Sequence, residues 1–434
     1  MALKKDIISI FKRDIIVFFL TFLTSIFIAR RLGPELLGIW TILRIVFSYS
    51  EAFGRSKVDV ASVYFIGRKK FSRADILSNV NFITLISSSF MILLALIFFQ
   101  SIYSWLFSQA VGSYIYQFIF LICIVPINFF YSNYLYFHIA VSNIKYYNQM
   151  ILIQSLANTI FSFLFLFFSD LQLWGLLIAS LVSNALAFGY GWYRVPGIVK
   201  SQGETNLRTS ISMLKYGLQF YISSLLSEFQ QSGSRLLSVA FVSPAYVGFL
   251  SQAHRLSLLL EKIENPINTA LFPRISSSSH ESATETTCKV FRISSVLIIF
   301  STIIFYFIVK PLILFLYGPE FLPVALAVYI ILPGTGFGCM SAILNSFYAG
   351  TGKAIINSYI QFLPICLQLL LAWYLLPRFG YIASPLSYSV GMFFYISIYI
   401  IYFLRNTKIS PALLLVTKND IRFIFYSLKT IFTH

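Results

Sequence analysis

Two arginines at matched depth in apolar spans are the residues of this chain best suited to bind a ligand. Arg44 lies nine residues after Glu35, where one span begins, and Arg255 lies nine residues after Tyr246, where another begins. Nine residues of helix rise about 13 Å, which reaches near the middle of a hydrocarbon core about 30 Å thick. Charges at that depth are costly and face a cavity or a counter-ion. The guanidinium fork fits phosphate and is never neutral, so the pattern predicts a site for an anion such as a diphosphate.

Other charged side chains recur at helical spacing around these arginines. Residues seven apart share a helix face, and this relation joins Arg44 to Glu51, Glu228 to Arg235 and His254 to Glu261. Arg30 adds a further arginine at the end of the first apolar span. We therefore predict two sets of functional residues. The substrate-binding set is Arg30, Arg44, Arg235 and Arg255, and the ion-coupling or charge-balancing set is Glu51, Glu228, His254 and Glu261.

The same residues also have a purely structural interpretation. The arginine–glutamate pairs would then be internal ion pairs that fix helix packing, and Glu51 would pair with Arg55 four residues on. Arg30 would extend its long side chain to the membrane interface. His254 stands next to Arg255, whose charge disfavours a second cation, and it is a candidate pH-responsive group.

The chain as a whole has the composition of a membrane protein. It is 58% hydrophobic and 11% charged, with a mean hydropathy of +0.80, whereas ordinary domains carry roughly 25% charged residues. A helix needs about 20 apolar residues to cross the bilayer. Such runs recur near residues 14–30, 36–54, 80–100, 114–139, 148–168, 173–193, 214–236, 245–266, 290–310, 323–345, 355–376 and 381–404. We therefore predict an all-α integral membrane protein with twelve transmembrane helices.

Lys and Arg are distributed unevenly between the loops, which gives the orientation. The two termini and the regions 54–79 and 194–215 are rich in these residues, whereas 101–113 and 242–246 have none. Because cytoplasmic loops carry the excess of Lys and Arg, we place both termini in the cytoplasm. The net charge of +17 is then mostly topological. Nucleic acid is disfavoured as a partner because the cations are spread over loops instead of gathered on one face.

An internal repeat divides the chain. The stretch Pro34 to Gly38 before one span recurs as Pro244 to Gly248 before another. Membrane proteins with two similar halves usually alternate access around a site between them. We predict two six-helix lobes and a basic, amphipathic tail of the kind that lies on an anionic membrane surface. The predicted limits are 1–193 for the N-terminal lobe, 194–213 for a cytoplasmic linker, 214–404 for the C-terminal lobe and 405–434 for a cytoplasmic tail.

Common enzyme motifs do not occur in the sequence. Ala349 to Lys353 ends like a P-loop, but Phe347 stands where that motif has its first glycine. HExxH, GxSxG and a paired Cys-x-x-Cys are also missing. We therefore expect a transporter and not an enzyme, with no cofactor and no bound metal. A gradient, or the disequilibrium of the substrate itself, would drive transport.

Several motifs, in order along nearly the whole chain, resemble those of bacterial polysaccharide flippases. Ile28 to Glu35, followed by Gly38 to Trp40, is similar to the first helical hairpin of the O-antigen translocases. These belong to the multidrug/oligosaccharidyl-lipid/polysaccharide exporter superfamily. Val247 to Leu256 and then Leu271 to Ile275 resemble the eighth-helix signature, and Leu316 to Phe321 resembles the pattern before the tenth helix.

The resemblance implies a two-lobed fold around a central cavity and a lipid-linked substrate. That substrate would be an O-antigen or similar polysaccharide repeat unit on undecaprenyl pyrophosphate, flipped from the cytoplasmic to the periplasmic leaflet of the inner membrane. Arg30 and Arg255 fall where related flippases place cavity cations. Many relatives have an acid beside a cation in the seventh span, whereas Ser234 precedes Arg235 here, so an ion-coupling role would pass to Glu228. The implied partners are membrane lipids, a polysaccharide polymerase and a chain-length regulator.

Other functions compete with this hypothesis. A multidrug or organic-cation exporter of the same superfamily would share the fold, but its cavity should be acidic, and the arginines argue against it. A membrane polysaccharide polymerase or ligase would need a large periplasmic loop, and the outward loops here are short. A lipid II flippase remains open within the leading class.

Overall fold

A computed structural model describes residues 2–197, 199, 203–353, 355–418, 420 and 422, with side chains from residue 9 onward except that of residue 263. Its packing separates two compact units. Unit 1 comprises Met1–Glu228 and Ser243–Ala245, and unit 2 comprises Phe229–Val242 and Tyr246–His434. The lobe limits drawn from the sequence, with a linker at 194–213, stay a prediction. The predicted tail beyond residue 418 lies outside the described residues, apart from Asp420 and Arg422.

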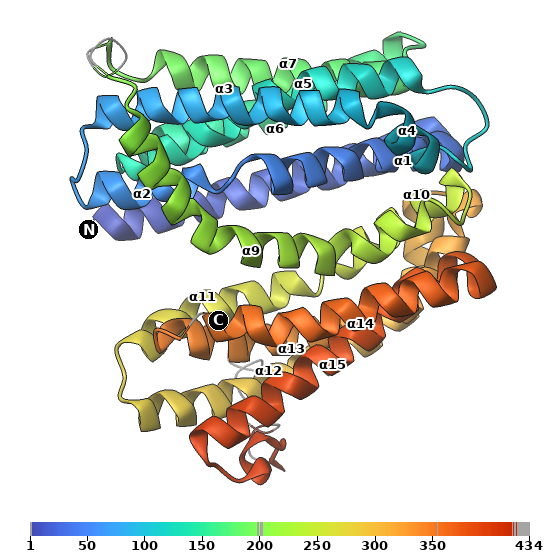
Figure 1. The fold of residues 1–434 in the computed structure, drawn as a ribbon. Helices are drawn as coiled ribbons and strands as arrows, with labels where there is room; N and C mark the ends of the chain where they lie inside the picture. The colour runs from blue at the N-terminus through green and yellow to red at the C-terminus, as the bar shows by residue number, and fades with distance from the viewer. Residues whose placement is uncertain are drawn as a thin grey trace. The chain divides into compact units, whose positions relative to one another are not determined.

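Unit 1 is a bundle of long helices (Figure 1). Its elements are α1 (Ala2–Gly54), α2 (Val58–Gly67), α3 (Arg73–Ile97), α4 (Phe99–Leu106), α5 (Ile115–Ala140), α6 (Ile144–Phe168), α7 (Gln172–Tyr193) and the first part of α9 (Leu207–Ser238). Helix α6 packs on both α1 and α7, and α5 packs on both α7 and α3.

Unit 2 repeats much of this order of elements. After the end of α9 it contains α10 (Pro244–Ser257) from Tyr246 onward, α11 (Glu261–Ser276), α12 (His280–Leu316), η1 (Pro319–Phe321), α13 (Pro323–Gly350), α14 (Ile355–Phe379), η2 (Gly380–Ile382), α15 (Ala383–Thr407) and η3 (Pro411–Leu414). Helix α13 packs on α12 and α15, and α14 packs on α15. These pairings match α5 with α3 and α7, and α6 with α7, in unit 1. The internal repeat in the sequence therefore corresponds to a repeat in packing.

Eight helical stretches in the described part of the chain are long and apolar enough to cross a membrane. Two of them hold two crossings each: Ser9–Gly54 reverses within α1, and Ile355–Thr407 joins α14 to α15 through η2. The more polar α9 and the pair α10–α11 complete the twelve crossings. The predicted fold class, an all-α membrane protein with twelve transmembrane helices, is confirmed.

The reversal within α1 occurs at Gly33. Its backbone has φ 69° and ψ 177°, a positive φ that glycine adopts without the steric cost of a Cβ. Pro34 follows and starts the second helical half, where its fixed φ suits a first helical position. Gly38, one turn further, packs against the backbone of Pro244, because a Cβ on Gly38 would lie 1.7 Å from the carbonyl oxygen of Pro244. Local backbone chemistry thus sets the bend between the first two crossings.

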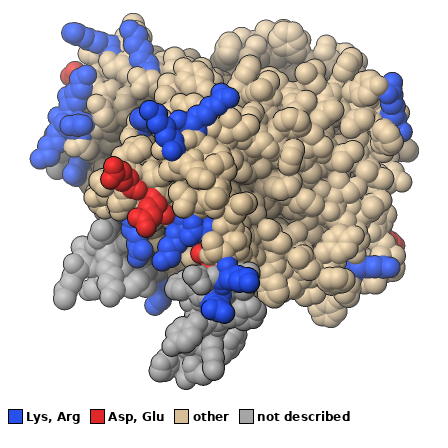
Figure 2. All heavy atoms as spheres, turned by 90° about the horizontal axis from the view of Figure 1, so that it is seen from below, with Lys and Arg blue, Asp and Glu red and all other residues tan. Residues whose placement is uncertain are grey.

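The basic regions of unit 1 meet at one end of its bundle. Arg13, near the start of α1, donates to the side-chain oxygen of Asn148 at 2.7 Å and lies over the ring of Tyr147, 4.8 Å from its centroid. At the end of α7, Arg194 lies 5.2 Å from the ring centroid of Tyr146. Figure 2 shows one face of the molecule, on which Lys and Arg side chains stand in groups beside broad uncharged areas. The basic residues at this end of unit 1 match the excess of Lys and Arg that loops on one side of a membrane protein carry.

Asn79 fixes the chain segment that leads into α9. Its side chain is fully buried and donates to the carbonyl oxygen of Glu204 at 3.1 Å. The same side chain accepts from the backbone N–H of Asn206 at 3.1 Å and from Ser210 Oγ at 2.7 Å. Asp75 also accepts from the N–H of Glu204 at 3.1 Å. The residues from Glu204 to Ser210 are therefore bound to the start of α3.

Candidate functional site

The second half of α1 carries a polar face in unit 1. Arg44, Ser48, Glu51 and Arg55 follow one another at steps of three or four residues, which places them on one side of the helix. Ser48 Oγ donates to Glu228 Oε1 at 2.6 Å. The predicted charge-balancing residues Glu51 and Glu228 therefore both belong to this region of unit 1.

Glu51 lies at the centre of a polar network. Its Oε1 accepts from Asn128 Nδ2 at 2.7 Å and from Ser132 Oγ at 3.4 Å. Arg55 approaches the same oxygen at 3.7 Å and forms a closer ion pair, at 2.6 Å, with the fully buried Asp59. The predicted pairing of Glu51 with Arg55 is confirmed. The negative charge of Glu51 is compensated in place by donors from α5 and by a neighbouring cation.

Arg30 and Arg44, the predicted binding residues of unit 1, are both exposed on α1. Arg30 stands just before the reversal at Gly33. Its neighbour Arg31 is held differently, since Arg31 Nε donates to the carbonyl oxygen of Leu166 at 2.9 Å. Arg30 and Arg44 thus both occupy exposed positions on an apolar span.

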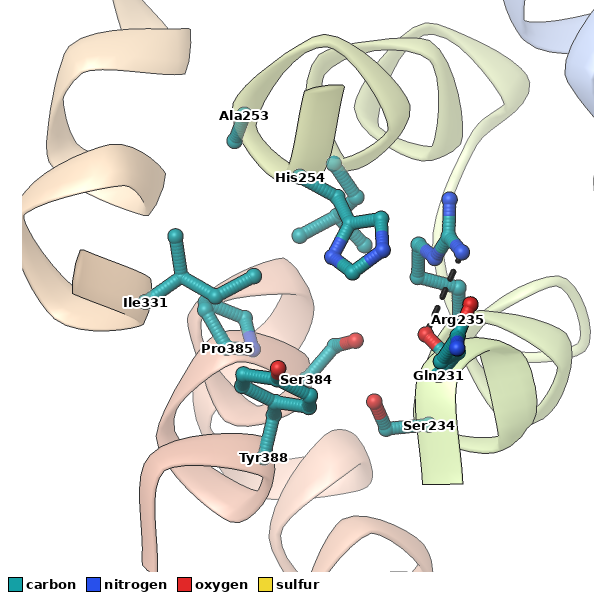
Figure 3. A pocket seen from close by; sticks show the side chains of 10 residues that line it. Gln231, Ser234, Arg235, Ala253, His254, Ile331, Ser384, Pro385 and Tyr388 are labelled. Atoms are coloured by element: carbon teal, nitrogen blue, oxygen red, sulfur yellow. Dashed lines mark hydrogen bonds between the residues drawn. The ribbon is translucent and has the colours of Figure 1, made fainter. Parts of the chain in front are cut away.

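Unit 2 contains a small polar pocket that includes Arg235 and His254 (Figure 3). The cavity holds about 10 Å³, which is room for about one water molecule. The imidazole of His254 meets the ring of Tyr388 nearly edge-on, with 5.9 Å between centroids, and Arg235 donates to the carbonyl oxygen of Gln231 at 3.2 Å. No carboxylate stands among the residues that line this pocket, which are Gln231, Ser234, Arg235, Leu250, Ala253, His254, Ile331, Ser384, Pro385 and Tyr388.

The eighth crossing is interrupted beside this pocket. Helix α10 ends at Ser257 and α11 begins at Glu261. Between them the N–H groups of Leu259 and Leu260 bond to carbonyls three residues back, that of Leu260 to Ser257 at 3.0 Å. The seven-residue spacing of His254 and Glu261 therefore cannot by itself place them on one face, because that inference assumes an unbroken helix. Arg255, half-buried near the end of α10, does not line the pocket of Figure 3.

Several polar residues of both units were missed in the sequence. Asn128 and Ser132 stand four residues apart in an apolar run, a spacing that could have revealed them. Glu264 is 4% exposed, and its Oε1 has no hydrogen-bond partner among the described residues. Gln230 accepts from the side chain of Gln361 and, through its backbone carbonyl, from Gln368 Nε2 at 3.0 Å. Only the fold reveals the latter contacts, because Gln230 is 131 and 138 residues away from Gln361 and Gln368 along the chain.

A family model described as polysaccharide biosynthesis protein matches residues 27–326. The chain belongs to this family. The match includes the polar face of α1, most of the residues lining the pocket of Figure 3 and Arg255, so both candidate regions lie largely within the part of the chain that is characteristic of polysaccharide biosynthesis proteins. Among curated proteins, no match is found.

Solved structures of transporters share the fold of this polysaccharide biosynthesis protein. An inward-facing multidrug resistance MATE family transporter of the MOP superfamily has a TM-score of 0.78 at 14% identity, over 91% of this chain and 94% of the transporter. The lipid II flippase MurJ, in an inward closed conformation, has a TM-score of 0.77 at 14% identity, over 98% and 92% of the two chains. The MATE transporter VcmN of Vibrio cholerae, in its bent form, scores 0.56 at 14% identity over 90% and 98%. These likenesses establish a common fold.

Proposed function

We propose that this protein is a flippase for lipid-linked oligosaccharide repeat units. The substrate class is an O-antigen or similar surface-polysaccharide unit on undecaprenyl pyrophosphate, moved from the cytoplasmic to the periplasmic leaflet of a bacterial inner membrane. The observation that carries the proposal is the polysaccharide biosynthesis family match on a chain with a transporter fold. One of the similar folds belongs to a flippase of another lipid-linked saccharide precursor, lipid II.

The exposed arginines support an anionic substrate. A charge on an apolar span is costly against lipid and is stabilised where it meets water or a counter-ion. Arg30 and Arg44 are exposed on α1, so we assign their faces to a hydrated cavity. There they would bind the diphosphate through paired N–H donors, together with Arg255 and Arg235 from unit 2. Glu51, Glu228, His254 and Glu261 would balance charge or carry a coupling ion.

The expected cycle is alternating access between the two lobes. The diphosphate would be captured with the site open to the cytoplasm, with the sugars in the hydrated cavity and the lipid tail in the membrane. Both termini would lie in the cytoplasm, as the loop charges indicate. A polysaccharide polymerase and a chain-length regulator would act on the product at the outer leaflet.

A multidrug exporter is the second candidate, because the MATE transporters share the fold. The arginine-rich spans oppose it, since an organic cation would be repelled by them.

Reconstitution in liposomes distinguishes the flippase from the multidrug exporter. Liposomes containing the purified protein and a lipid-pyrophosphate oligosaccharide are treated with an impermeant reagent that modifies outer-leaflet sugar. Protein-dependent exposure of the sugar supports the flippase. Organic-cation efflux without exposure of sugar would favour the exporter. Arg378→Ala, which changes an arginine outside the binding set that stacks on Tyr374 with 4.1 Å to the ring centroid, is the control for general loss of arginine charge.

A further inference from the structure

An apolar cavity of about 400 Å³ lies within unit 1. Its walls come from the second half of α1, from α3, α4 and α5, and from Tyr221 of α9. Several of its wall residues are exposed, so the space opens to the surface of unit 1 and can accept an occupant from outside. Its lining residues are Val46, Ser50, Phe53, Phe90, Met91, Ile92, Leu94, Ala95, Phe98, Ile102, Phe118, Ile122, Val125 and Tyr221.

The residues that line the cavity favour a hydrocarbon chain as the ligand. No charged side chain lines the cavity. Its two hydroxyl groups are already satisfied by the chain, because Ser50 Oγ donates to the carbonyl oxygen of Val46 at 2.9 Å and Tyr221 donates to that of Phe53 at 3.0 Å. A polar ligand would therefore lose its hydration without gaining partners. An apolar chain would lose nothing and would gain buried surface.

The cavity borders the surface that faces lipid. Phe53, Phe90 and Phe98 line it and are 43%, 56% and 53% exposed. Leu93 and Leu96, on the same helix as Phe90, are exposed as well, at 54% and 58%. Large exposed apolar residues on a membrane-spanning helix are expected where the helix meets lipid. A hydrocarbon chain can therefore reach the cavity from the bilayer without crossing a polar region.

The cavity and the arginine face lie on opposite sides of one helix. A residue of an α-helix turns by about 100° relative to the one before it. Val46, Ser50 and Phe53 are therefore turned by about half a revolution from the side that carries Arg44, Ser48 and Glu51. A lipid whose charged group is held at Arg44 has its own tail close to this helix. That tail has a high effective concentration at the cavity compared with unconnected acyl chains.

We propose that this cavity binds the isoprenoid tail of the lipid carrier, near its diphosphate end. The proposal rests on the function given above and adds a second subsite to it: Arg44 binds the charged group, the chain passes around this helix, and the cavity on its other side holds the isoprene units that follow. A dry protein cavity of about 150 Å³ binds benzene, so a volume of 400 Å³ suits about sixteen carbons, or about three isoprene units. The protein would thus bind the carrier on both sides of the junction between headgroup and tail.

Photolabelling tests the tail site without requiring transport. The probe is a sugar-free polyprenyl diphosphate of about eleven isoprene units, with a diazirine in the fourth unit from the diphosphate, beyond the part that passes around the helix. Labelled peptides are expected from α3 between Phe90 and Phe98 and from α5 between Phe118 and Val125. Ala95→Phe fills the cavity and should lower the labelling of these peptides at least about tenfold, which corresponds to about 1.4 kcal/mol of binding. Leu96→Phe adds bulk one residue away, on a side chain that does not line the cavity, and should leave labelling within about twofold.

Competition and folding controls keep the outcomes separate. Unlabelled polyprenyl diphosphate should compete with the probe, and a diacyl phosphatidate of equal charge should not. Competition by both would identify a general acyl-chain site and overturn the proposal, as would equal labelling of the Ala95→Phe and Leu96→Phe variants. Ile92→Trp is a second cavity-filling variant for use if Ala95→Phe melts below the wild type.

The liposome assay is run on the same preparations. Labelling of the predicted peptides by a wild type that exposes no sugar supports the tail site and contradicts the flippase. If the wild type exposes sugar and Ala95→Phe is labelled as strongly as the wild type, the tail site alone is contradicted.

Discussion

The partly buried charged groups of the two units have different surroundings. In unit 1, Glu51 receives Asn128 and Ser132 as donors and Arg55 as a counter-ion. In unit 2, Arg235 and His254 share a pocket whose lining includes no carboxylate, and Arg235 donates to a backbone carbonyl. The same order of helix packing therefore supports an acid that is compensated in one unit and a cationic pocket in the other.

This difference shows that a repeat in fold does not require a repeat in chemistry. Packing of α5 with α7 and of α13 with α15 depends on apolar faces that many sequences supply. The polar groups depend on single residues, such as Glu51 in unit 1 and His254 in unit 2.

The largest effect is expected when the arginines of both units are removed. Arg44→Ala and Arg255→Ala should each lower the rate of sugar exposure about tenfold to a hundredfold, because each removes a charged donor to the diphosphate. Arg44→Lys should retain more activity than Arg44→Ala, since it keeps the charge but loses the fork. Initial rates in liposomes at equal protein content measure both. Wild-type rates in both alanine variants would refute the arginine roles.

A smaller effect is expected from removing the acid of unit 1. Glu51→Met should lower the free energy of unfolding by about 1–3 kcal/mol, because Asn128 and Ser132 lose their acceptor while they stay buried. The melting temperature in detergent, followed by intrinsic fluorescence, provides the measurement. Glu320→Met, on the short helix η1, is the matched control. Unchanged melting of the Glu51 variant would mean that this network contributes little to stability.

The sequence predicted relations between near neighbours better than relations across the fold. The twelve crossings follow from apolar runs, and the Glu51–Arg55 pair follows from a four-residue spacing on a continuous helix. The relation of His254 to Glu261 stays a prediction, because the chain departs from α-helix between Ser257 and Glu261 and the seven-residue spacing alone does not place them on one face. The donors to Glu51 come from α5, and Asn128 is 77 residues away along the chain, so no local pattern encodes such a contact. The cavity of unit 1 is equally a product of packing between helices.

Replacing Glu264 of unit 2 by Met is expected to change the stability in the opposite direction from Glu51→Met. Its Oε1 has no hydrogen-bond partner among the described residues, and the side chain is buried. Glu264→Met keeps the approximate length and removes an uncompensated polar atom, so stability should stay level or rise by up to about 1 kcal/mol. Melting of this variant beside Glu51→Met tests the contrast directly. A loss as large as that of Glu51→Met would show that Glu264 is compensated in the folded protein.

The smallest effect concerns an ion pair of unit 2 whose acid lies beyond the last crossing. Arg292 Nε donates to Asp420 at 2.9 Å, and Arg292 Nη1 donates to the carbonyl oxygen of Leu413 at 2.7 Å. Burial alone would raise the pKa of Asp420, but hydrogen bonds from Thr417 and Arg292 outweigh it and lower the pKa below its ordinary value of 3.8. A carboxyl with a lowered folded-state pKa stabilises the fold above its unfolded value and loses that contribution as the pH falls through the folded one.

The attachment of residues 408–418 and Asp420 should therefore be constant above about pH 5 and weaken progressively as the pH falls through 3.8 toward the lower folded-state pKa of Asp420. Asp420→Asn should show the weakened state at every pH, with protease cleavage after Lys418 or Lys408 about twofold to fivefold faster at neutral pH, a modest change of the size expected for an ion pair near the surface. Limited proteolysis at neutral pH, together with hydrogen exchange across the acid range, would follow it. If wild type and Asp420→Asn exchange and are cleaved alike at neutral pH, the pair does not hold this segment, and the carboxylate–arginine compensation seen in unit 1 has no working counterpart at this position of unit 2.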